Sequence, residues 1–191
     1  MVGSFSRGDL EGWELKEYEG EVDYNLVEVD GRKVLRAKSF AAASGRIRKM
    51  KIDLEKTPYL NWSWRVDNVM QGLDERTKKG DDYPARVYLI FSGGMQVWKT
   101  RAVNYVWSNN QRVGTEWPSA YTKNNMKIAV QSGKKKLGVW VEEKRNVVED
   151  FRRLFKKDPP EKVDAVAIMT DTDNSGQSAI AYYGDIWFSS E

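Results

Sequence analysis

The stretch Tyr59-Leu-Asn-Trp-Ser-Trp-Arg-Val66 alternates apolar and polar side chains along its whole length. This period of two residues is typical of a β-strand, because successive side chains point to opposite faces of a sheet. We therefore expect the apolar set, which includes Trp62 and Trp64, to face a core, with Arg65 on the opposite side. The stretch predicts a half-buried strand and a fold organised around β-sheets.

Similar alternation recurs along most of the chain, and Asp30-Gly31 between two such runs is a strong hairpin signal. Strands do not alternate with helices, so an α/β fold is not expected. The pattern predicts an all-β fold, a single β-sandwich of the jelly-roll type over residues 1–191. The candidate strands are residues 13–18, 23–29, 33–39, 44–52, 59–66, 85–91, 101–107, 127–131, 137–145, 163–170 and 179–188.

Two connections are unusually long, residues 67–84 and 108–125. Loops of this length tend to be functional or mobile. A shorter connection around Ser132-Gly133 predicts a hairpin between residues 127–131 and 137–145.

One helix is expected, starting after Asn146 and ending before Asp158-Pro-Pro160. Asn146 can cap its first turn, and Glu149 stands three residues later in the capping-box position. The predicted apolar stripe consists of Val147, Val148, Phe151, Leu154 and Phe155.

The charges are nearly balanced, with 31 basic and 28 acidic residues and a net charge of +3. Acidic residues are interleaved with the lysines, whereas a nucleic-acid-binding protein usually segregates its positive charge. No nucleic-acid partner is therefore expected. No apolar run approaches the length of a transmembrane helix, so no membrane insertion is expected either. The N-terminal Met1-Val-Gly-Ser-Phe5 lacks the features of a signal peptide.

The chain contains no cysteine and no histidine. Disulfides, thiolate metal sites, histidine-based zinc sites and imidazole bases are therefore excluded. Any catalysis would depend on carboxylates, Lys, Tyr, Arg or a bound metal ion.

Polar, aromatic and arginine side chains recur on the strands around Trp62. Sugar-binding proteins use such mixtures, because aromatic rings stack on the C–H faces of pyranoses and polar groups bind the hydroxyls. The alternative is that most of the rings fill the core, as tryptophans usually do. The candidate ligand-binding residues are Arg65, Arg86, Tyr88, Arg101, Asn104, Tyr105 and Trp107.

Asp171-Thr-Asp-Asn-Ser-Gly176 has oxygen-bearing side chains at alternate positions and a glycine at position six, as a calcium loop does. Its twelfth position is Tyr182 instead of the required Glu. Ca²⁺ is the one cofactor that the pattern indicates, and a turn rich in Asx hydrogen bonds is the alternative. The candidate ligands are Asp81, Asp82, Asp171, Asp173 and Asp185. The loops at Asp81-Asp82 and Asp171–Gly176 each stand where a strand begins or ends, so we expect them to lie close together. Carboxylates gathered there without a covering arginine would repel one another, and a bound Ca²⁺ would relieve that repulsion.

Four strings together resemble a known family: Thr57–Val66, Arg76–Tyr83, Asn104–Trp107 and Ala167–Asn174. The chain resembles the bacterial domain-of-unknown-function family 3047 nearly end to end. The resemblance implies a single-domain, exported protein, periplasmic or secreted, and it assigns no catalytic residues. The lack of a signal peptide then predicts a mature form.

The closing Tyr183–Phe188 is similar to the last strand of galactose-binding-like carbohydrate-binding modules, a likeness at the level of the fold. The resulting hypothesis is non-catalytic binding of a glycan or another cell-envelope ligand. Two alternatives stay open. One is a carboxylate-based polysaccharide hydrolase or lyase, and a hydrolase requires two carboxyl groups across one cleft. The other is a structural envelope protein.

Overall fold

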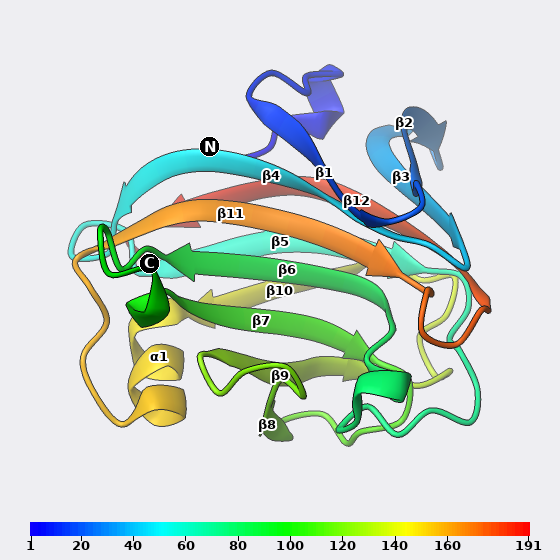
Figure 1. The fold of residues 1–191 in the computed structure, drawn as a ribbon. Helices are drawn as coiled ribbons and strands as arrows, with labels where there is room; N and C mark the ends of the chain where they lie inside the picture. Colours follow the sequence, from blue (N-terminus) through cyan, green and yellow to red (C-terminus); the bar gives the residue numbers. More distant parts are fainter.

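Two β-sheets pack face to face in the computed structural model, which describes residues 1–191 (Figure 1). The strands are β1 (Trp13–Glu19), β2 (Asp23–Val29), β3 (Arg32–Phe40), β4 (Ala43–Asp53), β5 (Tyr59–Val66), β6 (Tyr83–Phe91), β7 (Arg101–Ser108), β8 (Glu116–Pro118), β9 (Asn125–Ser132), β10 (Val141–Asn146), β11 (Lys162–Asp171) and β12 (Ser178–Ser189). The helix α1 spans Val147–Phe155, and three short 3-10 turns are η1 (Phe5–Arg7), η2 (Lys78–Gly80) and η3 (Val97–Lys99).

The larger sheet has seven strands in the order β1-β4-β11-β6-β7-β9-β8, and the smaller has five in the order β10-β5-β12-β3-β2. Every pair is antiparallel except β7 and β9, which are parallel. The predicted jelly-roll β-sandwich with one helix is therefore confirmed.

The core lies between the sheets, and tryptophans join its two sides. Trp62 and Trp64 of β5 are buried, as the alternation predicts. The Trp62 ring lies 5.3 Å from that of Tyr105, and the Trp64 ring lies 5.9 Å from that of Trp107. Because β5 and β7 belong to different sheets, these contacts hold the sandwich together.

The predicted hairpin around Ser132-Gly133 was wrong. β9 pairs with β7 and β8 in the larger sheet, whereas β10 pairs with β5 in the smaller one. The intervening segment crosses between the sheets, and Gly138 N–H donates to the Val66 carbonyl at 2.9 Å on the way. Local turn chemistry cannot distinguish a hairpin from such a crossing.

The long connection after β5 is anchored by a buried acid. Glu75 is fully buried and accepts hydrogen bonds from Ser108 Oγ (2.6 Å) and the Asn109 N–H. Burial raises the pKa of the Glu75 carboxyl. Its backbone carbonyl also accepts from Tyr83 and Trp117. These contacts tie the two long connections to each other and to the end of β7.

The helix begins as predicted, with Asn146 Oδ1 accepting from Glu149 N–H at 3.2 Å. Phe151 is fully buried, and its ring centre lies 4.8 Å from that of Phe91 and 4.6 Å from that of Phe155. The protein has no helix with the length and apolar character needed to cross a membrane.

Replacing Phe151 with Ala should lower the free energy of unfolding by about 3–5 kcal/mol, because a buried ring is lost and a cavity remains. Urea denaturation measures the effect. Arg152→Ala on the exposed side of the same helix is the control, and it should change stability by about 0.5 kcal/mol or less. An unchanged midpoint for Phe151→Ala would show that the helix does not dock through this ring.

Candidate functional site

The outer face of the seven-stranded sheet carries a row of polar side chains. Val87 of β6 packs in the core, so its neighbours Arg86 and Tyr88 point to the other side of the sheet. Tyr88 stands opposite Asn104 of β7, which in turn stands opposite Lys127 of β9. Directly paired residues share a face, so these three side chains belong to one row. Asn104 and Lys127 are fully buried, whereas Tyr88 is partly exposed.

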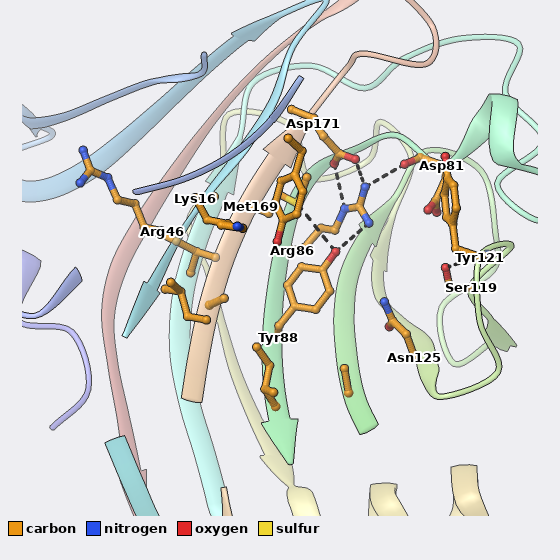
Figure 2. Close-up of a pocket in the computed structure, with 18 of the residues that line it drawn as sticks. Lys16, Arg46, Asp81, Arg86, Tyr88, Ser119, Tyr121, Asn125, Met169 and Asp171 are labelled. Atoms are coloured by element: carbon orange, nitrogen blue, oxygen red, sulfur yellow. Dashed lines mark hydrogen bonds and ion pairs between the residues drawn. The ribbon is translucent and has the colours of Figure 1, made fainter. Parts of the chain in front are cut away.

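A groove of about 550 Å³ lies over this face. Figure 2 shows Tyr88 near its middle, with Lys16 and Met169 on one side and Tyr121, Ser119 and Asn125 on the other. The lining residues come from β1 and β4 (Lys16, Tyr18, Ala43, Gly45, Arg46, Ile47), from β6, β7 and the residue before β7 (Arg86, Tyr88, Ile90, Ala102, Thr100), from the second long connection and the start of β9 (Ser119, Tyr121, Thr122, Asn125), from β11 (Ala167, Ile168, Met169, Asp171) and from loops at one end (Asp81, Asp173, Asn174).

Arg86 organises the acidic end of the groove. Its Nε donates to Asp171 Oδ1 at 2.8 Å, and its Nη2 forms an ion pair with the other oxygen of the same carboxylate. Nη2 also donates to the Asp81 carbonyl (2.8 Å), and Nη1 donates to the Tyr88 hydroxyl (2.9 Å). Both charged side chains of the pair are almost completely buried. The guanidinium therefore neutralises one carboxylate and fixes the orientation of the tyrosine in the groove (Figure 2).

A second buried ion pair lies beside the first. Lys127 Nζ is 2.6 Å from Asp81 Oδ1, and the Lys127 side chain is completely buried. Burial lowers the pKa of the Lys127 ammonium. The centre of the Tyr83 ring lies close to both cations, 4.4 Å from the Arg86 guanidinium and 5.4 Å from Lys127 Nζ.

The two acidic loops lie together, as predicted from their places at strand ends. Asp82 accepts hydrogen bonds from the backbone N–H groups of Asn174 (3.2 Å) and Ser175 (2.7 Å). Carboxylate oxygens of Asp82, Asp171 and Asp173 lie within 4.8 Å of one another. Burial and the neighbouring Asp82 charge raise the pKa of Asp173.

These three carboxylates are the residues that could hold a metal ion. Ca²⁺ was expected because clustered carboxylates without a neighbouring arginine would repel one another. Arg86 covers Asp171, and two backbone N–H groups already bind Asp82. Calcium binding therefore stays a prediction, and the repulsion that motivated it is largely relieved by the protein itself.

Asp185 does not belong to this cluster. It lies on β12 of the other sheet, where its carboxylate accepts from Ser6 N–H (2.8 Å) and Ser6 Oγ (2.6 Å). Its inclusion among the metal ligands was wrong, because a strand position does not show which sheet the strand joins.

The predicted ligand-binding face was also wrong in its grouping. Arg65 lies on the smaller sheet and pairs with Asp30 and Asp67. Tyr105 and Trp107 point inward and are fully buried in the core.

Arg101 lies outside the groove, with its guanidinium 5.6 Å from the centre of the Phe155 ring. Arg86, Tyr88 and Asn104 do share the outer face, and the first two line the groove. Alternation separates odd from even positions on a strand, but it does not show which set faces the core when both contain aromatic rings.

Several groove residues were not predicted, among them Lys16, Tyr18, Ser119, Tyr121 and Asn125. Lys16 and Tyr18 lie on the edge strand β1, and the others lie in or just after the second long connection. The unusual length of the connection over residues 108–125 was the one feature of the sequence that indicated a functional role for this segment.

Arg46 lines the groove chiefly through its position on β4. Its guanidinium points away from the other labelled side chains in Figure 2 and lies 5.8 Å from the centre of the Tyr24 ring.

The family model described as "Protein of unknown function (DUF3047)" matches residues 11–187. The chain belongs to this family. The predicted resemblance is thereby confirmed. No curated protein sequence matches the chain.

Solved structures with a similar fold include proteins that cleave or bind polysaccharides. One is the xyloglucanase domain of NopAA, a type three effector from Sinorhizobium fredii, in complex with cellobiose (TM-score 0.53, 9% identity, covering 100% of this chain and 98% of that one). Another is a carbohydrate-binding module, CBM28, specific for non-crystalline cellulose (TM-score 0.50, 15% identity, covering 98% of this chain and 93% of that one). A third is endoglucanase cel12A from Rhodothermus marinus (TM-score 0.50, 10% identity, covering 93% of this chain and 95% of that one). At these identities the likeness shows the fold alone.

Proposed function

We propose that the protein binds a glycan chain, without cleaving it, in the groove on the seven-stranded sheet. The observation that carries this proposal is the combination of three tyrosines, Tyr18, Tyr88 and Tyr121, with hydrogen-bonding side chains along one groove. Export to the cell envelope, where such a ligand would be met, stays a prediction from the family resemblance.

The chemistry of the groove suits a sugar chain. Tyrosine offers an apolar ring for the C–H face of a pyranose and a hydroxyl for its polar edge. Lys16, Ser119 and Asn125 supply donors and acceptors for sugar hydroxyls on both sides of Tyr88 (Figure 2). The groove volume, about 550 Å³, lies within the usual range of ligand sites. The polysaccharide-binding and polysaccharide-cleaving proteins of similar fold support the same ligand class.

A glycan array followed by titration calorimetry on the best ligand tests this proposal. Tyr121→Ala should weaken binding about tenfold or more, because it removes an exposed ring from the groove. Tyr182→Ala is the matched control, since Tyr182 is a partly exposed tyrosine on the smaller sheet. Equal affinity for Tyr121→Ala and the wild type, or no binding to any glycan, would contradict the proposal.

Hydrolysis in the same groove is the second candidate. Asp171 and Asp173 have oxygens within 4.8 Å of each other, and the Asp173 pKa is raised, as a general acid requires. Retaining glycosidases separate their two carboxyl groups by about 5–5.5 Å. Against this, both oxygens of Asp171 are already bound by Arg86. New reducing ends released by the wild type and abolished by Asp173→Asn would favour the hydrolase over the binding protein.

A further inference from the structure

The loop between β6 and β7 exposes three large apolar side chains within four residues. Met95 is 98% exposed, Val97 is 72% exposed and Trp98 is 71% exposed. None of the three lines the groove. Exposed apolar side chains clustered in one short loop are typical of surfaces that contact a partner or a membrane.

The backbone of this loop is held in a defined shape. Gln96 N–H donates to the Gly93 carbonyl at 3.0 Å, and Gly93 N–H donates to Thr100 Oγ1 at 3.1 Å. From outside the loop, Asn124 Nδ2 donates to the Trp98 carbonyl at 2.8 Å. The three apolar side chains are therefore presented by a structured turn.

Three basic residues lie near the base of this loop, together with one acidic residue, Asp164, whose carboxylate accepts from Ser92 N–H at 2.8 Å. Lys99 ends η3, Arg101 begins β7, and Lys157 follows the end of α1. The Arg101 guanidinium lies 5.6 Å from the centre of the Phe155 ring, which places it beside the end of the helix. None of the three cations forms an ion pair within the protein. The acidic loops lie at the opposite end of β6, beyond Tyr83 (Figure 1).

We propose that this loop, residues 93–99, docks the protein onto an anionic lipid surface. Trp98, Val97 and Met95 would enter the headgroup region, where tryptophan is favoured, and the basic residues would face the lipid phosphates. A lipid surface accounts for both the exposed apolar side chains and the unpaired basic residues. A glycan is a poorer candidate for this loop, because the Met95 and Val97 side chains offer no hydrogen bonds to sugar hydroxyls. Such a contact is shallow and needs no membrane-spanning segment. The absence of a long apolar run excludes a spanning helix but does not exclude this kind of surface contact. The acidic end would then point away from the membrane.

Vesicle sedimentation with the full chain tests this. We expect co-sedimentation with vesicles of phosphatidylcholine and phosphatidylglycerol, and little with phosphatidylcholine alone. Trp98→Ser and Lys99→Glu should each lower the partition coefficient about fivefold or more. The matched controls are Phe40→Ser, which removes a ring that is 75% exposed elsewhere, and Lys135→Glu, which reverses an exposed charge on another loop. Both should stay within about twofold of the wild type.

A second readout separates insertion from simple charge attraction. Lipids brominated near the headgroup should quench tryptophan fluorescence in the wild type and much less in Trp98→Ser. Equal sedimentation with both kinds of vesicle, or none with either, would overturn the proposal. So would a wild type that is dimeric in sedimentation velocity and becomes monomeric in Trp98→Ser, because the loop would then contact a second copy. Glycan binding should be unchanged in Trp98→Ser, so the two proposals can fail separately.

Discussion

Replacing Arg86 with Met is expected to lower the free energy of unfolding by about 3–5 kcal/mol, because it leaves a buried carboxylate without its cation. The Asp171 carboxylate would lose both hydrogen-bonding contacts with the guanidinium and keep the hydrogen bond from Tyr83 N–H at 3.2 Å. The same change removes the hydrogen bonds that the Arg86 guanidinium donates to the Tyr88 hydroxyl and to the Asp81 carbonyl. Glycan binding in the groove should therefore fall together with stability.

Three further variants identify the cause. Arg86→Lys keeps the charge but cannot reproduce the forked contacts, so it should lose part of the stability. Asp171→Asn combined with Arg86→Met removes both charges and should recover much of the loss relative to Arg86→Met alone. Arg46→Met, at a partly buried arginine on β4 outside this network, is the matched control. Urea midpoints for Arg86→Met and Arg46→Met that agree within error would show that the buried pair contributes no net stability.

Replacing Lys127 with Met should have an effect of similar size, about 3–5 kcal/mol, because Asp81 then lies buried without its partner. The double variant Asp81→Asn, Lys127→Met should be closer to the wild type than either single variant. Lys144→Met, at an exposed lysine of β10, is the control and should change stability by about 0.5 kcal/mol or less. A double variant as unstable as the sum of the two single variants would contradict coupling between the two residues.

This pair also predicts a pH dependence. Burial lowers the pKa of Lys127 below its ordinary value of 10.5. As the pH rises toward 10.5, the folded state releases this proton while the unfolded state still holds it, so the unfolded state binds more protons. Stability from this group therefore increases with pH in that window. The wild type should gain stability relative to Lys127→Met between neutral pH and about pH 10. An unchanged or shrinking difference would contradict the assigned direction of the pKa shift.

Local patterns in the sequence were sufficient for the fold class. The alternation from Tyr59 to Val66 placed Trp62 and Trp64 in the core, and Asn146 marked the start of the helix. Strand period, turn residues and helix caps act over a few residues, so they can be read without knowing what packs against them. The meeting of the acidic loops was predictable for a related reason, since each loop stands at the end of a strand.

The groove was decided by tertiary structure. β5 and β6 are consecutive in the chain but belong to different sheets, so Arg65 and Arg86 never share a face. β7 carries rings on its core side and Asn104 on the other, and only packing against Trp62 shows which side is inside. The cations that compensate the acidic loops, Arg86 and Lys127, come from strands that lie far from Asp171 in the chain. Pairing between distant strands depends on which surfaces bury the most apolar area together, and no short stretch of sequence contains that information.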